Sequence, residues 1–171
     1  MALPSPGHLL DQAHRLTAPL GPGAPRQTDL RRAISSAYYG VFHAVVAAAA
    51  DDFAGRTKRH TPRYALVYRS IQHKTLRALC EDIVKSNLPA KYQDHVPKGG
   101  FGTDLEAFAN AVVDLHEKRH KADYDPRYRV STSDAVLAVA TGRTALSLLT
   151  NANRTRKKAF LSVVVFPPRS R

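Results

Sequence analysis

The segment 28–52, TDLRRAISSAYYGVFHAVVAAAADD, constrains the fold most, because its apolar residues cover nearly every side of a helix. Its main apolar line recurs at steps of three and four residues: Leu30, Ile34, Ala37, Val41, Ala44, Val45 and Ala48. A helix that is hydrophobic on so many sides has to be surrounded by other elements. We therefore expect this segment to be the central helix of a bundle, with Thr28 as its N-cap and Asp29 in its first turn.

The rest of the chain up to residue 160 is also predicted to be helical. One helix is expected over about 7–17, and another region from the N-cap Thr61 and Pro62 to about Ile83, with a bend near His73. A capping box at 103–106 and a polar cap at 131–134 begin two further helices. Loops rich in Pro or Gly separate these segments. Residues 1–150 are thus predicted to form an all-α, up-and-down bundle of four to five helices.

Residues 151–171 differ from the rest in composition. They hold six of the 26 Lys and Arg residues and no acidic residue, and they contain the apolar run FLSVVVF. Such a run favours a short strand or an aggregation-prone extension. We expect a basic C-terminal tail, extended or partly disordered, outside the helical bundle.

The charge balance favours a polyanionic partner. There are 26 Lys and Arg residues against 14 Asp and Glu residues, a net charge of +12, and basic surfaces bind phosphate chains. A basic surface that serves only solubility is the alternative. The single cysteine, Cys80, excludes an intrachain disulfide and a cysteine-cluster zinc site. No secretory signal or membrane span is recognised, so a soluble, cytoplasmic protein without metal or cofactor is expected.

Polar residues interrupt the apolar pattern of the central helix along one line. Arg32, Ser36, Tyr39 and His43 follow one another at steps of four, three and four residues. A buried imidazole needs a hydrogen-bond partner. We interpret His43 as a core histidine held by a tyrosine or a carboxylate of another helix, with a role in a binding site as the alternative.

The helix predicted from Thr103 changes character along its inward face. Its first turns present Leu105, Phe108, Ala109 and Val112, and the same line continues as His116, Arg119, His120 and Asp123. Amphipathic helices usually place such residues on the opposite face. A cleft with a guanidinium and two imidazoles suits phosphate. The alternative is an interhelical hydrogen-bond network in which Arg119 and Asp123 also pair one turn apart.

Three stretches together resemble the HEPN family (higher eukaryotes and prokaryotes nucleotide-binding domain), in its stand-alone bacterial branch. They are RRAISSAYYGVFHAVV, DLHEKRHKADYDP and YRVSTSDAVLAVATGRTALSLL, and the resemblance covers about residues 9–150. It implies a bundle that dimerises and brings two polar stripes to one cleft. Many members of the family are metal-independent endoribonucleases in toxin–antitoxin and other defence systems, and some pair with a nucleotidyltransferase antitoxin.

Arg119, Asp123 and Tyr124 match the family pattern as a site or structural motif, but no His follows Arg119 after four to six residues, as it does in the ribonuclease members. Three functions therefore stay open. The first is binding of RNA or nucleotides through Arg32, Tyr39, His43, Asp123, Tyr124 and the run Arg154, Arg156, Lys157 and Lys158. The second is RNA cleavage, with Arg119 on the phosphate and His116 or His120 as acid or base. The third is a non-catalytic dimerisation module.

Overall fold

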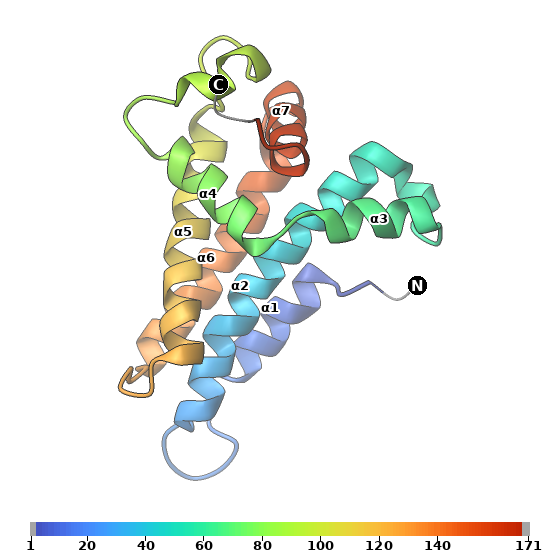
Figure 1. Cartoon of the computed structure of the whole chain (residues 1–171). Coiled ribbons are helices and arrows are strands. Elements are labelled where there is room, and N and C mark those ends of the chain that lie inside the picture. The colour runs from blue at the N-terminus through green and yellow to red at the C-terminus, as the bar shows by residue number, and fades with distance from the viewer. Residues whose placement is uncertain (1–2, 169–171) are drawn as a thin grey trace.

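The computed structural model describes residues 3–168, and within this range the chain is helical and has no strand (Figure 1). Four helices run alternately down and up the molecule: α1 (Pro6–Arg15), α2 (Gln27–Ala50), α5 (Thr103–Tyr124) and α6 (Thr132–Asn151). The shorter helices α3 (Pro62–Ser70), α4 (His73–Ile83) and α7 (Arg154–Val165) pack around them. The predicted all-α class is confirmed, with more helices than the four or five expected.

Helix α2 is the centre of the molecule, as its apolar pattern predicted. It contacts α1, α3, α5, α6 and α7. Its side chains Ile34, Val41 and Val45 are almost completely buried. The predicted N-cap at Thr28 is wrong, because the helix begins at Gln27 after Arg26. The side-chain amide of Gln27 donates through Nε2 to the carbonyl of Val130 at 2.7 Å, and its Oε1 accepts from the Val130 N–H at 3.0 Å. These bonds join the start of α2 to the loop before α6.

Two glycines let α1 approach the long helices closely. The side chain of Leu10 lies between Gly40 of α2 and Gly142 of α6. A Cβ atom added to Gly142 would be 2.7 Å from Leu10 Cδ2, and one added to Gly40 would be 3.2 Å from Leu10 Cγ. Leu10 is consequently 1% exposed, and it joins three helices.

Local capping explains where several helices begin. Thr61 accepts a hydrogen bond from Tyr64 N and is followed by Pro62, and Ser131 forms a capping box with Asp134; both N-caps were predicted. The predicted bend near His73 is confirmed as an extended step at residues 71–72 between α3 and α4. The predicted capping box at residues 103–106 is wrong. Gly102, at a φ of 83°, is the N-cap of α5, and Thr103 is already helical.

Helix α2 ends in tight turns that reverse the chain. A turn of π-helix, η1 (Asp51–Gly55), is followed by the 3₁₀ turn η2 (Arg56–Lys58). Gly55 has a φ of 92°, a conformation that residues with a side chain rarely adopt. The reversal brings Arg59 back to Asp51, at 2.9 and 2.5 Å. A third short turn, η3 (Ala90–His95), lies in the long connection between α4 and α5.

The C-terminal segment contradicts the extended tail that its sequence suggested. Residues 154–165 form helix α7, and Asn153 caps it by accepting from Thr155 N and Arg156 N. Phe160 is fully buried and meets Phe101 and Phe108 edge-on, at ring distances of 6.2 and 5.7 Å. The segment belongs to the same core as residues 3–150, because burial against other helices outweighs the strand preference of its valines. Arg169 and Arg171 lie outside the described residues.

The region from Gln27 to Lys58 is long and apolar enough to satisfy the length and composition of a membrane span. Of its most apolar window, 67% is buried inside the bundle. The core helix of a soluble protein has these same properties, so this observation is weak evidence for a membrane location.

Candidate functional site

Arg119 is held between α5 and α2 by hydrogen bonds and an ion pair. Its Nη2 donates to Tyr39 Oη at 2.8 Å, and its Nε lies 2.8 Å from Asp123 Oδ2. The Nε–H is not directed at an acceptor, so the contact with Asp123 is an ion pair without an aligned hydrogen bond. Asp123 Oδ1 in turn accepts from Ser35 Oγ at 2.5 Å. These contacts fix the guanidinium, whose side chain is 13% exposed.

Three tyrosine rings surround this guanidinium. Its Cζ lies 5.8 Å from the ring centroid of Tyr38, 5.4 Å from that of Tyr39 and 5.5 Å from that of Tyr124. These distances are within the range of cation–π attraction. The rings also differ in depth, since Tyr38 is 1% exposed and Tyr124 is 65% exposed. Arg119 therefore lies between a buried aromatic floor and an aromatic side chain that faces solvent.

His73, at the start of α4, is part of the same cluster. Its Nδ1 is 2.9 Å from Tyr38 Oη, and its ring lies 3.8 Å from the ring of Phe42. Burial and the positive charge of Arg119 lower the pKa of His73 to about 4, so the imidazole is neutral at pH 7. The sequence pattern did not indicate this residue. A histidine at the start of another helix has no spacing that relates it to Arg119.

His116 also belongs to the cluster and lies one helical turn before Arg119 on α5. Its ring meets Tyr38 edge-on at 5.4 Å, and the residue is 8% exposed. Burial, together with the charges of Arg77 and Arg119, lowers the pKa of His116. Its Nδ1 is buried and has no hydrogen-bond partner among residues 3–168. An unpaired buried polar group costs roughly 1–3 kcal/mol, so this nitrogen is a natural position for a water or ligand atom.

No family model, no curated protein and no solved structure matches this chain. The HEPN resemblance rests on the three stretches quoted above. In the structure the first two stretches are in contact: Ser35 donates a hydrogen bond to Asp123, and Arg119 donates one to Tyr39. The third begins at the loop before α6 and continues along that helix.

The predicted inward position of His120 is wrong. The residue is exposed, and its ring lies 5.1 Å from the ring of Tyr124. Because it follows Arg119 directly, it is turned by about 100° around the helix. His120 and Tyr124 together form the outer rim of the cluster.

The polar line predicted on α2 is divided among three environments. Tyr39 bonds Arg119, whereas Arg32 is exposed and Ser36 is buried. His43 Nδ1 lies 2.7 Å from Tyr68 Oη, which confirms the predicted tyrosine partner on another helix, although the residue is only partly buried. Burial lowers its pKa.

The neighbouring Arg31, which sequence analysis did not single out, anchors the end of α5. Its guanidinium donates to the carbonyls of Ala122 at 3.0 Å and Asp125 at 2.8 Å, and also to that of Tyr128. Carbonyls at a helix C-terminus lack partners within the helix, and a cation there is favourable. Arg31 therefore holds in place the turn of α5 that carries Asp123 and Tyr124. The adjacent pair Arg31 and Arg32 was the sequence feature that could have pointed to this role.

The basic run on α7 is remote from this cluster. Arg156 lies against Gly102 at the start of α5, and Arg119 is roughly 25 Å further along that helix at a rise of 1.5 Å per residue. Lys157 Nζ donates to the carbonyl of Thr150 at 2.9 Å, while Arg154 and Lys158 are exposed. Among the described residues no three His, Cys, Asp or Glu side chains are grouped as metal ligands.

Proposed function

We propose that this chain is a HEPN-like RNA-binding protein that holds single-stranded RNA at the Arg119 cluster. One observation carries this proposal: a fixed, partly exposed guanidinium lies among tyrosine rings, of which Tyr124 is 65% exposed. Unpaired RNA bases stack on aromatic rings and guanidinium planes, and phosphate oxygens accept hydrogen bonds from arginine. Tyr124 and His120 would receive a base, and Arg119 the adjoining phosphate.

The overall charge supports a polyanionic partner. A net charge of +12 raises the local concentration of a nucleic acid and speeds its association. The HEPN resemblance extends the proposal to a cytoplasmic homodimer in a toxin–antitoxin or defence system, with a nucleotidyltransferase as antitoxin partner. A second copy of the chain beside the first would place two Arg119 clusters along one RNA strand.

A second candidate function, metal-independent cleavage of RNA, is favoured by the two imidazoles beside Arg119. His73 and His116 both have lowered pKa values and are neutral at pH 7. A neutral imidazole can accept the proton of a ribose 2′-hydroxyl while it attacks the adjoining phosphorus, and Arg119 would stabilise the charged phosphorane. The protonated imidazole would then return its proton to the leaving 5′-oxygen.

The experiment that tests RNA binding compares two arginines. Fluorescence anisotropy with a labelled single-stranded RNA is measured on the wild type, Arg119→Ala and Arg143→Ala. Arg143 is an exposed residue of α6 that pairs with Asp11 at 2.8 Å. Both variants remove one arginine, so both lower the net charge by the same amount. We expect Arg119→Ala to weaken binding roughly tenfold or more and Arg143→Ala much less, because in the proposed complex Arg119 contacts the phosphate and Arg143 does not. Equal effects, or no RNA affinity at low salt, would contradict the proposal.

The same variants separate binding from cleavage and from a purely structural role. Incubation of RNA with the wild type in EDTA tests cleavage, and His73→Gln and His116→Gln should each slow it if the imidazoles transfer protons. If Arg119 only locks α5 to α2 within the bundle, Arg119→Ala will lower the melting temperature and leave the RNA affinity of the folded protein unchanged. A lowered RNA affinity at a temperature where the variant is fully folded supports the binding site.

A further inference from the structure

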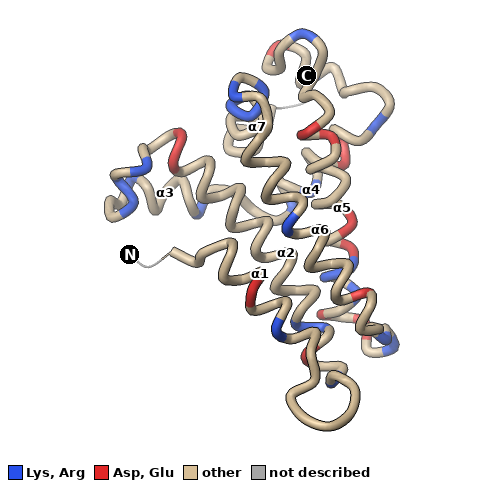
Figure 2. Tube along the Cα trace, turned by 180° about the vertical axis from the view of Figure 1, so that it is seen from behind, with Lys and Arg blue, Asp and Glu red and all other residues tan. Residues whose placement is uncertain are grey.

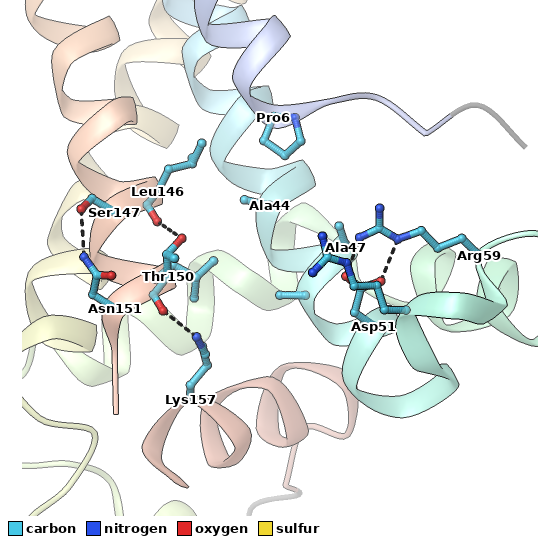
Figure 3. Close-up of a pocket in the computed structure, with 13 residues that line it drawn as sticks. Pro6, Ala44, Ala47, Asp51, Arg59, Leu146, Ser147, Thr150, Asn151 and Lys157 are labelled. Atoms are coloured by element: carbon cyan, nitrogen blue, oxygen red, sulfur yellow. Dashed lines mark hydrogen bonds and ion pairs between the residues drawn. The ribbon is translucent and has the colours of Figure 1, made fainter. Parts of the chain in front are cut away.

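A separate hollow lies where the ends of α2 and α6 meet α7 (Figure 3). Its volume is about 640 Å³, and it shares Ala48, Asp51 and Lys157 with a neighbouring hollow of about 340 Å³. We call the two together the α2–α7 groove. A volume of a few hundred cubic ångströms is typical of sites for small organic ligands. None of its lining residues belongs to the Arg119 cluster.

The floor of the groove is small and apolar, whereas one wall is polar. Ala44, Ala47 and Ala48 of α2 leave room above the helix, with Pro6 and Leu146 beside them. The last turn of α6 contributes the hydroxyl and amide side chains of Ser147, Thr150 and Asn151. Figure 3 shows Ser147 and Asn151 bonded to each other on the side of α6 away from α2, with Lys157 below the end of α6. Such a lining accommodates an organic ring that carries polar substituents.

Cations reach the groove from two segments that are far apart in the sequence. The reversal after α2 supplies Arg56 and Arg59, and α7 supplies Arg154, Lys157 and Lys158. Figure 2 shows Lys and Arg gathered on α7 and on the segment that leads into α3. The turn at Gly55 and the break at Asn153 are what bring these two segments to the ends of α2 and α6.

The acidic residues of the groove neutralise only part of this charge. Asp51 is bound by Arg59 at 2.9 and 2.5 Å and by Tyr64 Oη at 2.9 Å. Asp52 lies 3.8 Å from Lys158 Nζ, and within the described part of the chain Lys157 Nζ donates to the backbone carbonyl of Thr150 and to no carboxylate. Among residues 3–168, Arg56 and Arg154 have no ion-pair partner. The groove therefore holds a surplus of positive charge above an apolar floor.

We propose that the α2–α7 groove binds a small organic phosphate, with the phosphate between Arg56 and Lys157 and the ring above the alanines of α2. Arginine and lysine donate charge-assisted hydrogen bonds to phosphate oxygens. The polar residues of the last turn of α6 would border the ring on one side. This site is independent of RNA binding at Arg119.

The test uses two substitutions of one exposed residue. Ser147→Glu adds a negative charge to the α6 wall of the groove, and Ser147→Gln adds a side chain of nearly the same size without charge. Isothermal titration calorimetry with adenosine 5′-monophosphate, ribose 5-phosphate and inorganic phosphate measures affinity. We expect Ser147→Glu to weaken binding of the organic phosphates roughly tenfold or more, because like charges oppose each other there. Ser147→Gln should change it less than Ser147→Glu does.

Three further variants make the result specific. Lys157→Ala should also weaken binding, whereas Lys98→Ala, which removes an exposed charge from the loop before α5, should not. Arg119→Ala should leave the phosphate affinity unchanged, which separates this site from the proposed RNA site. The proposal is overturned if none of the three phosphates binds at millimolar concentration, if the Glu and Gln variants behave alike, or if only RNA affinity responds to Ser147→Glu. Thermal melts confirm that each variant is folded.

Discussion

Arg156 of α7 lies against the backbone of Gly102, so closely that a Cβ atom on Gly102 would be 2.0 Å from Arg156 Nη1. Gly102 also has a φ of 83°, in the region that favours glycine. The two residues come from the start of α5 and the first turn of α7. Their contact joins the C-terminal helix to the loop that begins the helix of the Arg119 cluster.

Gly102→Ala should therefore destabilise the protein mainly through backbone strain, with a smaller contribution from displacing the flexible end of the Arg156 side chain. We expect a loss of roughly 1–3 kcal/mol in the free energy of unfolding, measured by urea denaturation. Gly100→Ala is the matched control, because Gly100 has a φ of 75° but nothing within 4 Å of an added Cβ. It isolates the strain, so an equal loss in both variants would show that the contact with Arg156 has no effect.

Leu10→Ala should remove the side chain that joins α1 to α2 and α6. Leu10 is 1% exposed and fits against Gly40 and Gly142, so its truncation leaves a cavity that the glycines do not fill. The expected cost is roughly 2–5 kcal/mol, read from chemical unfolding. Leu20→Ala, at a position that is 80% exposed, should cost less than about 0.5 kcal/mol. Similar costs for the two variants would mean that α1 is not anchored through Leu10.

Arg31→Ala should release the C-terminal turn of α5, because Arg31 donates to the carbonyls of Ala122, Asp125 and Tyr128. Hydrogen bonds that involve a charged group contribute roughly 1.5–3 kcal/mol, and we expect a loss of that order in thermal unfolding. Arg32→Ala removes the same charge from the next, exposed position of α2. A loss of stability in Arg32→Ala as large as that in Arg31→Ala would contradict the proposed anchoring of the α5 C-terminus by Arg31.

Acidification should destabilise the protein through His73. Its pKa is about 4 in the folded chain against an ordinary value of 6.5, so the unfolded chain binds more protons between these two values. Stability is fully present above pH 6.5 and is lost progressively as the pH falls towards 4. NMR titration of the His73 ring should place its midpoint well below 6.5, and His73→Gln should weaken the dependence of the melting temperature on pH in this window. A midpoint near 6.5 would contradict the buried environment.

Local sequence patterns were sufficient where a helix depends on its own residues. The apolar line of α2 predicted its central place, and the N-caps at Thr61 and Ser131 were recognisable because a cap bonds within its own turn. Patterns misled where a distant partner determined the outcome. Helix α2 begins before Thr28, where Gln27 bonds Val130, and α5 follows a positive φ at Gly102 instead of a side-chain cap.

The candidate site shows the same division. The spacing of His116 and Arg119 predicted that both are turned inward, and their burial confirms it. The same spacing wrongly included His120, which lies at the edge of that face. His73 was missed because helix α4 brings it to Arg119 only after the chain has folded.

The sequence by itself determined the helical class, the central helix and the concentration of basic and imidazole groups, because periodicity and composition act over a few neighbouring residues. Only the tertiary structure decided which of those groups meet. In the tertiary structure the C-terminal valines belong to helix α7, and Tyr39 and His73 lie beside Arg119. Segments about a hundred residues apart in the sequence form the α2–α7 groove. The physical reason is that burial of apolar surface and pairing of buried polar groups depend on contacts between distant segments, which no local pattern records.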